Sequence, residues 1–111
     1  MSDFAEFLHD VFSAFGTVNC RKMFGGYGVY HNGVMFGLIA DDILYLKADK
    51  SFAEEFLQRE LPQFQYPKGD KMVKMSYFQA PEEIYDNTED AERWARKAYR
   101  CAVKAKKEKR K

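Results

Sequence analysis

The chain has 111 residues, 46% of them hydrophobic and 16% aromatic, which favours one folded domain and excludes an intrinsically disordered protein. Its first residues, MSDFAEF, lack the basic and apolar segments of a signal peptide, and no apolar run is long enough to span a membrane. Cys20 and Cys101 show no metal-binding or redox spacing. We therefore expect a cytoplasmic protein with reduced thiols and no membrane contact.

The net charge of +1 conceals two regions of opposite sign. Residues 93–111 contain ten basic residues and one acidic residue, which leaves eight basic and 16 acidic residues in residues 1–92. The body of the chain therefore carries about −8 and the C-terminal segment about +9. An acidic body would repel a DNA duplex, so strong and specific DNA binding by this chain alone is disfavoured.

The first predicted element is an amphipathic helix that ends at Gly16, a residue that tolerates the left-handed conformation of a helix C-terminus. Its apolar residues recur at helical spacing and form one stripe along the helix: Phe4, Phe7, Leu8, Val11, Phe12 and Phe15. We expect this stripe to be buried against the rest of the domain.

The segment from Cys20 to Asp49 is typical of a β-meander, with short apolar runs separated by turn residues. Asn32-Gly33 predicts a two-residue type I′ turn, so residues 28–31 and 34–40 should pair as antiparallel strands. Asp41-Asp42 should then return the chain into a third strand over residues 43–47.

A second helix is predicted from Asp49 or Ser51 as far as Pro62, which stops it. A short strand around Phe64 and Tyr66 and a fifth strand over residues 72–78 follow, joined by a turn.

The last helix is predicted from Asn87 or Thr88, with an apolar period that continues to Val103. The apolar period is lost from Lys104 onward, so we expect this basic end to be frayed.

The elements predict an α+β fold with two layers, in the order α-β-β-β-α-β-β-α. Short connections favour a single antiparallel five-stranded sheet with the helices packed on one face. We assign residues 1–103 to a single domain and residues 104–111 to a basic tail.

No set of residues suggests catalysis, a metal site or a bound cofactor. Gly25-Gly26-Tyr27-Gly28 lacks the Lys-Ser/Thr pair of a phosphate-binding loop and precedes a strand, so a bulged turn with closely packed backbones is favoured. His9 and His31 are the only histidines, and neither a catalytic triad nor a three-ligand zinc set can be drawn. We expect a protein that is not an enzyme.

Methionines and tyrosines are dense along the predicted strands. Two interpretations remain open: these residues form the core, or they lie on a sheet face without helices that binds a protein or a second copy. They are Met23, Tyr27, Tyr30, Met35, Tyr45, Met72, Met75 and Tyr77.

The basic tail also has two interpretations. It is either a solvated helix end whose cations favour the negative pole of the helix dipole, or a tether that contacts nucleic-acid phosphates. The candidate tether residues are Lys104, Lys106, Lys107, Lys109, Arg110 and Lys111.

Several segments together resemble the N-terminal domain of the TfoX/Sxy family, proteins linked to natural competence (DNA transformation) in bacteria. They are RKMFGGYG at residues 21–28, MFGLIA at 35–40, LYLKAD at 44–49, MSYF at 75–78 with Pro81 after it, and Trp94-Ala95. The resemblance spans nearly the whole chain.

The resemblance implies a cytoplasmic, non-enzymatic regulator that works with the cyclic-AMP receptor protein on competence promoters. It also implies a two-layer α+β fold similar to secretion-chaperone-like domains, which tend to dimerise. Full-length members carry a second, C-terminal domain, and we expect this chain to be a stand-alone relative without it.

Our leading hypothesis is an accessory transcription regulator that contacts the cyclic-AMP receptor protein or the RNA polymerase machinery, with weak non-specific DNA contact through the tail. The candidate partner-binding residues are Arg21, Lys22, Met23, Phe24, Gly25, Gly26 and Tyr27. The alternative is a homodimeric, chaperone-like binding module with no nucleic-acid role. An enzyme would need a pocket with convergent polar groups, which the sequence does not indicate.

Overall fold

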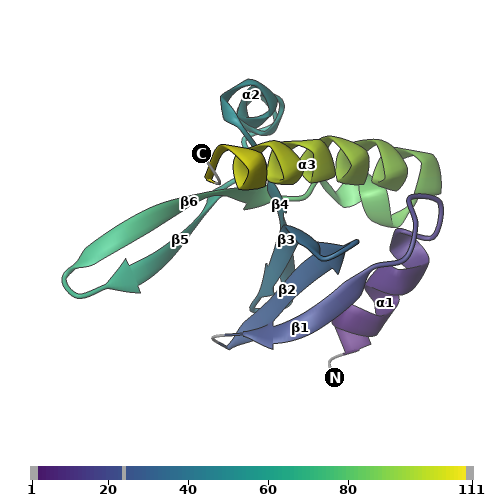
Figure 1. The fold of residues 1–111 in the computed structure, drawn as a ribbon, viewed down its shortest axis with the longest axis horizontal. Helices are drawn as coiled ribbons and strands as arrows, with labels where there is room; N and C mark the ends of the chain where they lie inside the picture. The colour runs from purple at the N-terminus through teal and green to yellow at the C-terminus, as the bar shows by residue number, and fades with distance from the viewer. Residues whose placement is uncertain (1–2, 24, 110–111) are drawn as a thin grey trace.

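A computed structural model of the chain describes residues 3–23 and 25–109 (Figure 1). The elements in chain order are α1 (Asp3–Val11), β1 (Asn19–Met23), β2 (Gly26–His31), β3 (Val34–Ala40), β4 (Ile43–Lys47), α2 (Lys50–Gln58), β5 (Gln63–Lys68), β6 (Lys71–Gln79), the 3-10 turn η1 (Glu82–Tyr85) and α3 (Thr88–Lys109). Within these residues the fold has three α-helices and one antiparallel sheet, which confirms the predicted α+β class.

The sheet has the strand order β1-β2-β3-β4-β6-β5, with every neighbouring pair antiparallel. The prediction of five strands was wrong, because β1 is a sixth strand at one edge. Its sequence, NCRKM, places Arg21 and Lys22 next to each other and has no apolar alternation. Charged residues are common on edge strands, where they discourage pairing with other chains, and they remove the pattern by which a strand is recognised.

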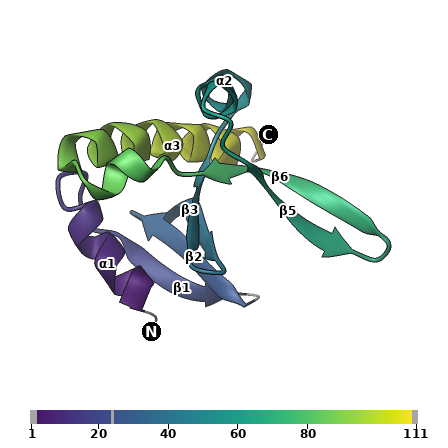
Figure 2. The same cartoon turned by 180° about the vertical axis from the view of Figure 1, so that it is seen from behind.

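The helices pack on one face of this sheet. In Figures 1 and 2, α3 runs across the sheet, α2 lies against α3, and α1 lies beside β1. The main core joins all three helices to side chains from that face alone, among them Val29, Phe36, Leu44, Leu46 and Phe78. The β5–β6 hairpin extends away from this body, and its outer residues are largely exposed (Figure 1).

Trp94 of α3 is fully buried and holds α2 in place. Its ring centroid lies 5.5 Å from that of Phe52 and 5.1 Å from that of Phe56, both on α2. Phe56 in turn stacks on Phe78 of β6 at 5.3 Å, so a chain of aromatic contacts runs from α3 through α2 to the sheet.

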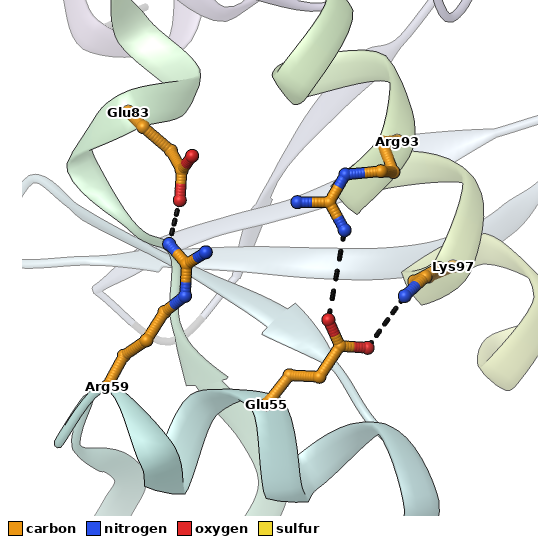
Figure 3. Close-up of polar contacts among 5 residues, drawn as sticks. All are labelled: Glu55, Arg59, Glu83, Arg93 and Lys97. Atoms are coloured by element: carbon orange, nitrogen blue, oxygen red, sulfur yellow. Dashed lines mark hydrogen bonds and ion pairs between the residues drawn. The ribbon is translucent and has the colours of Figure 1, made fainter.

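Figure 3 shows ion pairs whose cations lie next to this aromatic cluster, with Arg59 and Arg93 over the ring of Trp94. Glu55 of α2 accepts a hydrogen bond from Lys97 Nζ at 2.7 Å and lies 3.8 Å from Arg93. Arg59 pairs with Glu83 of η1. Because these side chains are more than a third exposed, water screens the pairs and each contributes about 1 kcal/mol at most. Aromatic burial therefore dominates the docking of α2.

Two hairpin turns confirm the predicted meander. Asn32 and Gly33 have φ of 49° and 77°, as a type I′ turn requires. Asp41 and Asp42 have φ of 52° and 58°, so the second turn has the same handedness but is built from two residues with side chains. This left-handed conformation is unfavourable for residues other than glycine, although Asp tolerates it better than most.

Helix α3 continues to Lys109, so the expected fraying from Lys104 is not observed in residues 104–109. Lys, Ala and Glu are good helix formers, and cations are favourable at a helix C-terminus even without an apolar stripe. Arg110 and Lys111 lie outside the described residues.

We predict that aromatic burial and the ion pairs differ sharply in their effect on stability. Phe52→Ala should lower the free energy of unfolding by about 3 kcal/mol, because it leaves a cavity against Trp94. Glu55→Gln, on the same helix, should lower it by about 1 kcal/mol at most. Urea unfolding followed by Trp94 fluorescence measures both, and equal losses would contradict this account.

We also predict that Asp42→Gly stabilises the protein by about 0.5–1 kcal/mol, because glycine removes the left-handed strain at this turn position. Asp70→Gly is the matched control. Asp70 is a turn residue without positive φ, so glycine there should only add freedom to the unfolded chain and lower stability. Thermal unfolding measures the stability of both variants. A change of stability in the same direction for both would contradict the explanation.

Candidate interaction surfaces

The turn between β1 and β2 carries most of the predicted partner-binding segment. Lys22, Met23, Gly25, Gly26 and Tyr27 line an open pocket of about 430 Å³. Phe24 lies outside the described residues. Lys22 and Gly25 are exposed, so the pocket is accessible to a partner.

The glycines of this turn have structural roles. Gly25 has φ of 78°, which favours glycine. A Cβ on Gly26 would lie 2.0 Å from the carbonyl oxygen of Ile39, so only glycine allows β2 and β3 to approach this closely. The predicted close backbone packing is thus confirmed, while the register irregularity lies further along, between Val29 and Tyr30.

Strand pairing divides the predicted segment between the two faces of the sheet. Arg21 pairs with Gly28 and Met23 with Gly26, and both side chains are on the face without helices. There the Arg21 guanidinium lies 4.8 Å above the ring of Tyr30. Tyr27 faces the other way and packs against the main core. The six described residues of the segment therefore meet at the turn but do not form one continuous surface.

The face of the sheet opposite the helices, which we call the open face, collects most of the methionines and tyrosines that the sequence left unassigned. The strand registers place on it Met23, Tyr30, Met35, Leu38, Tyr45, Phe64, Tyr66, Val73, Met75 and Tyr77. Of the eight residues noted in the sequence, Tyr27 packs on the core and Met72 lies on the other side of the β5–β6 hairpin, where it is 58% exposed. The remaining six lie on the open face.

Aromatic and cationic groups alternate on the open face. Lys47 Nζ lies 5.1 Å from the ring centroid of Tyr77. Burial, and secondly the nearby Tyr30, raise the pKa of Tyr77 to about 12. The rings of Tyr45 and Phe64 meet edge to face at 5.0 Å, and burial followed by the charge of Asp41 raises the pKa of Tyr45.

Within the described strands the charges are all of one sign. The six strands contain Arg21, Lys22, Lys47, Lys68, Lys71 and Lys74 and no Asp or Glu. The acidic residues lie in helices and turns, so the excess acidic charge of residues 1–92 comes from α1, α2, η1, the first turn of α3 and the turns between elements.

The C-terminal turns of α3 adjoin the open face. Lys106 and Ala105 share a pocket of about 280 Å³ with Lys47, Tyr77 and Met35. Lys104 lines a neighbouring pocket beside Asp49 and Ser76, and Lys104, Lys106 and Lys107 are exposed. Sequence reasoning missed this juxtaposition, because only the packing of α3 across the sheet brings residues 104–106 beside β4 and β6.

His31 and the two cysteines lie in surroundings that indicate a structural role and not a chemical one. His31 Nδ1 lies 2.7 Å from the carbonyl oxygen of Thr17, and its ring packs between Phe15 and Tyr99. Burial raises the pKa of the Cys20 and Cys101 thiols, which makes them poor nucleophiles at neutral pH.

Over residues 3–23 and 25–109, no three His, Cys, Asp or Glu side chains gather closely enough to hold a metal ion. None of the helices in this part of the chain is long and apolar enough to cross a membrane.

The fold and its surfaces define a small α+β domain with one helix-covered and one open sheet face. The model of the TfoX N-terminal domain matches residues 10–102, and the chain belongs to this family. It is 28% identical over 82 residues to DNA transformation protein TfoX1 of Aliivibrio fischeri, a match that covers 74% of this chain and 39% of that protein. It is 25% identical over 91 residues to protein Sxy of Escherichia coli, covering 82% and 44% respectively. The chain therefore aligns with less than half the length of either relative.

We predict that stability falls as the pH rises from 10 to 12. Tyr77 and Tyr85 have folded-state pKa values of about 12, above the ordinary value of 10, mainly because both are buried. Their contribution is fully present below pH 10 and is lost through pH 12, because the unfolded chain releases these protons first. Tyr77→Phe and Tyr85→Phe should each make the fall shallower, as measured by urea unfolding across this range. An unchanged slope in both variants would contradict the assignment.

Proposed function

We propose that this chain is an accessory transcription regulator of the competence type that acts through protein contacts and has no enzymatic activity. The observation that carries this proposal is the family match over residues 10–102. The name of the Aliivibrio fischeri relative refers to DNA transformation, which supports the same role for this chain. A cytoplasmic location fits a regulator that works at promoters.

The proposed partner is the cyclic-AMP receptor protein or a component of the RNA polymerase machinery. It would contact the pocket at the β1–β2 turn, where Lys22 and Gly25 are exposed and Met23 and Tyr27 supply apolar surface. Lys22 gives this surface a positive charge, which would suit an acidic patch on the partner.

The C-terminal turns of α3 would add weak, sequence-independent contact with duplex DNA. Lys104, Lys106 and Lys107 are exposed and helical, so they could reach phosphates without further ordering. Each phosphate that they neutralise would add roughly −0.9 to the slope of log K against log salt. Replacing all three by Gln should remove this contact.

We predict that Lys22→Glu weakens binding of purified cyclic-AMP receptor protein about tenfold or more, because it reverses the charge beside the pocket. Lys50→Glu is the matched control, since Lys50 is an exposed lysine at the start of α2, outside both proposed surfaces. Binding would be measured by fluorescence anisotropy with the labelled chain, and in parallel with RNA polymerase. No binding to either protein, or equal effects of the two variants, would overturn the proposed contact.

A homodimeric binding module without a nucleic-acid role is the second candidate, favoured by the Met- and Tyr-rich open face. Analytical ultracentrifugation would measure the oligomeric state and so test for this dimer. A stable dimer that binds neither the transcription proteins nor DNA at low salt would support this alternative over the regulator.

A further inference from the structure

We propose that the open face of the sheet binds single-stranded nucleic acid, with bases stacked on its aromatic rings and phosphates held by its lysines and arginine. This activity goes beyond the protein contact proposed above and uses different residues. Its experimental test is therefore independent of the test of the protein contact.

The first support is charge. The described charged side chains on the open face are Arg21, Lys47, Lys68 and Lys71, all cationic. Lys106 extends this positive surface toward the tail, because it lines the same pocket as Lys47 and Tyr77. Acidic residues lie at the rim of the face: Asp41 and Asp42 follow β3, Asp70 is at the tip of the hairpin, and Asp49 and Glu108 line a pocket with Lys47. A polyanion is the ligand that such a surface fits.

Lys68 and Lys71 make the charge argument sharper. They are directly paired across β5 and β6, and both are exposed. Like charges at such a pair destabilise a hairpin, and only Asp70 in the intervening turn opposes them. The pair does not stabilise the fold, whereas an anion bound between the two ammonium groups would be attracted by both.

The second support is the aromatic content. Tyr30, Tyr45, Phe64 and Tyr66 are only partly buried, so each presents part of a ring to solvent on the open face. Phe64 and Tyr66 lie nearly parallel, with centroids 6.4 Å apart and planes 24° apart. Solvent-facing rings interleaved with cations on an uncovered sheet are the arrangement on which nucleotide bases stack.

Other occupants fit less well. A second copy packed face to face would bring four cations against the same four cations, without acidic strand residues to compensate within the described sheet. Pairing along the edge of β5 is opposed by Pro67, which has no N–H to donate. A duplex hides its base faces, so the rings would gain nothing from it.

The size of the face suits a strand of several nucleotides. Six strands with spacings of about 4.8 Å place the two edges roughly 24 Å apart. The β5–β6 hairpin lengthens this surface beyond the body of the domain (Figure 2). For comparison, an OB fold binds on the order of 4–16 nucleotides of single strand.

The test is fluorescence anisotropy of the full chain with labelled oligothymidylate and oligouridylate of about 15 nucleotides, and with a duplex of equal length. Single strands should bind more tightly than the duplex. Tyr66→Ala and Tyr45→Ala should each weaken single-strand binding about five- to hundredfold, whereas Tyr66→Phe should retain it, because the ring is kept. Lys68→Gln with Lys71→Gln should reduce the salt slope by about 1.4.

Two matched controls separate this site from the rest of the chain. Phe7→Ala removes a 44% exposed ring from the helical side, and Lys50→Gln removes an exposed lysine there. Neither should change single-strand binding. Circular dichroism confirms that each variant is folded.

Three results would overturn the inference. They are no single-strand binding at low salt, equal or tighter binding of the duplex, and binding lost on replacing Lys104, Lys106 and Lys107 by Gln but unaffected by the tyrosine variants. If Tyr45→Ala and Tyr66→Ala instead abolish binding of the cyclic-AMP receptor protein and spare the oligonucleotides, the open face is a protein surface.

Discussion

The burial of Trp94 is the constraint on which the arrangement of this domain depends. Helix α3 must cross the sheet to bring Trp94 over the core, and α2 must fold back to cover it with Phe52 and Phe56. The short link from β6 through η1 then places all helices on one side (Figure 1). Once that side is filled, no element of the described chain remains to cover the other. The open face is thus a consequence of where the large aromatic side chains of the helices are buried.

Charge follows the same division. The acidic residues lie in helices and turns, where Glu55 and Glu83 pair with cations around the aromatic cluster (Figure 3), whereas the charged residues of the described strands are all basic. The part of α3 from Arg93 onward is also predominantly basic. Exposed ion pairs contribute little to stability, and because each joins opposite charges they also add little to the field at a distance. An anionic ligand is therefore attracted to the sheet and to the later turns of α3, and repelled by α1, η1 and the first turn of α3. A net charge of +1 therefore hides a domain whose basic groups gather on the sheet and on the later turns of α3, and whose acidic groups gather in α1, η1 and the turns.

Local sequence patterns predicted most of the helices, strands and turns. The sequence did not indicate the contacts between distant segments. Asn32-Gly33 specified its turn because few other residues adopt two successive positive φ angles. The apolar stripe correctly marked the first helix, but its predicted end at Gly16 was wrong, because α1 ends at Val11 and a turn follows. Strand β1 was missed because an edge strand with adjacent Arg21 and Lys22 carries no apolar alternation. The glycine turn was recognised, but the division of its neighbours between two faces depends on register. The approach of Lys106 to Tyr77 depends on how α3 crosses the sheet, which no spacing in the sequence encodes.

The two proposed surfaces meet at β1. Lys22 borders the pocket at the β1–β2 turn, while Arg21, its neighbour, lies over Tyr30 on the open face. Because adjacent strand residues point to opposite faces, one short edge strand can serve a protein on one side and a nucleic acid on the other. A partner protein held at the turn would then sit beside any strand bound on the open face, without competing for the same side chains. Such a domain would connect a protein and a nucleic acid through a single strand of its sheet, and the charged residues that discourage this edge from pairing with other chains would also supply the contacts.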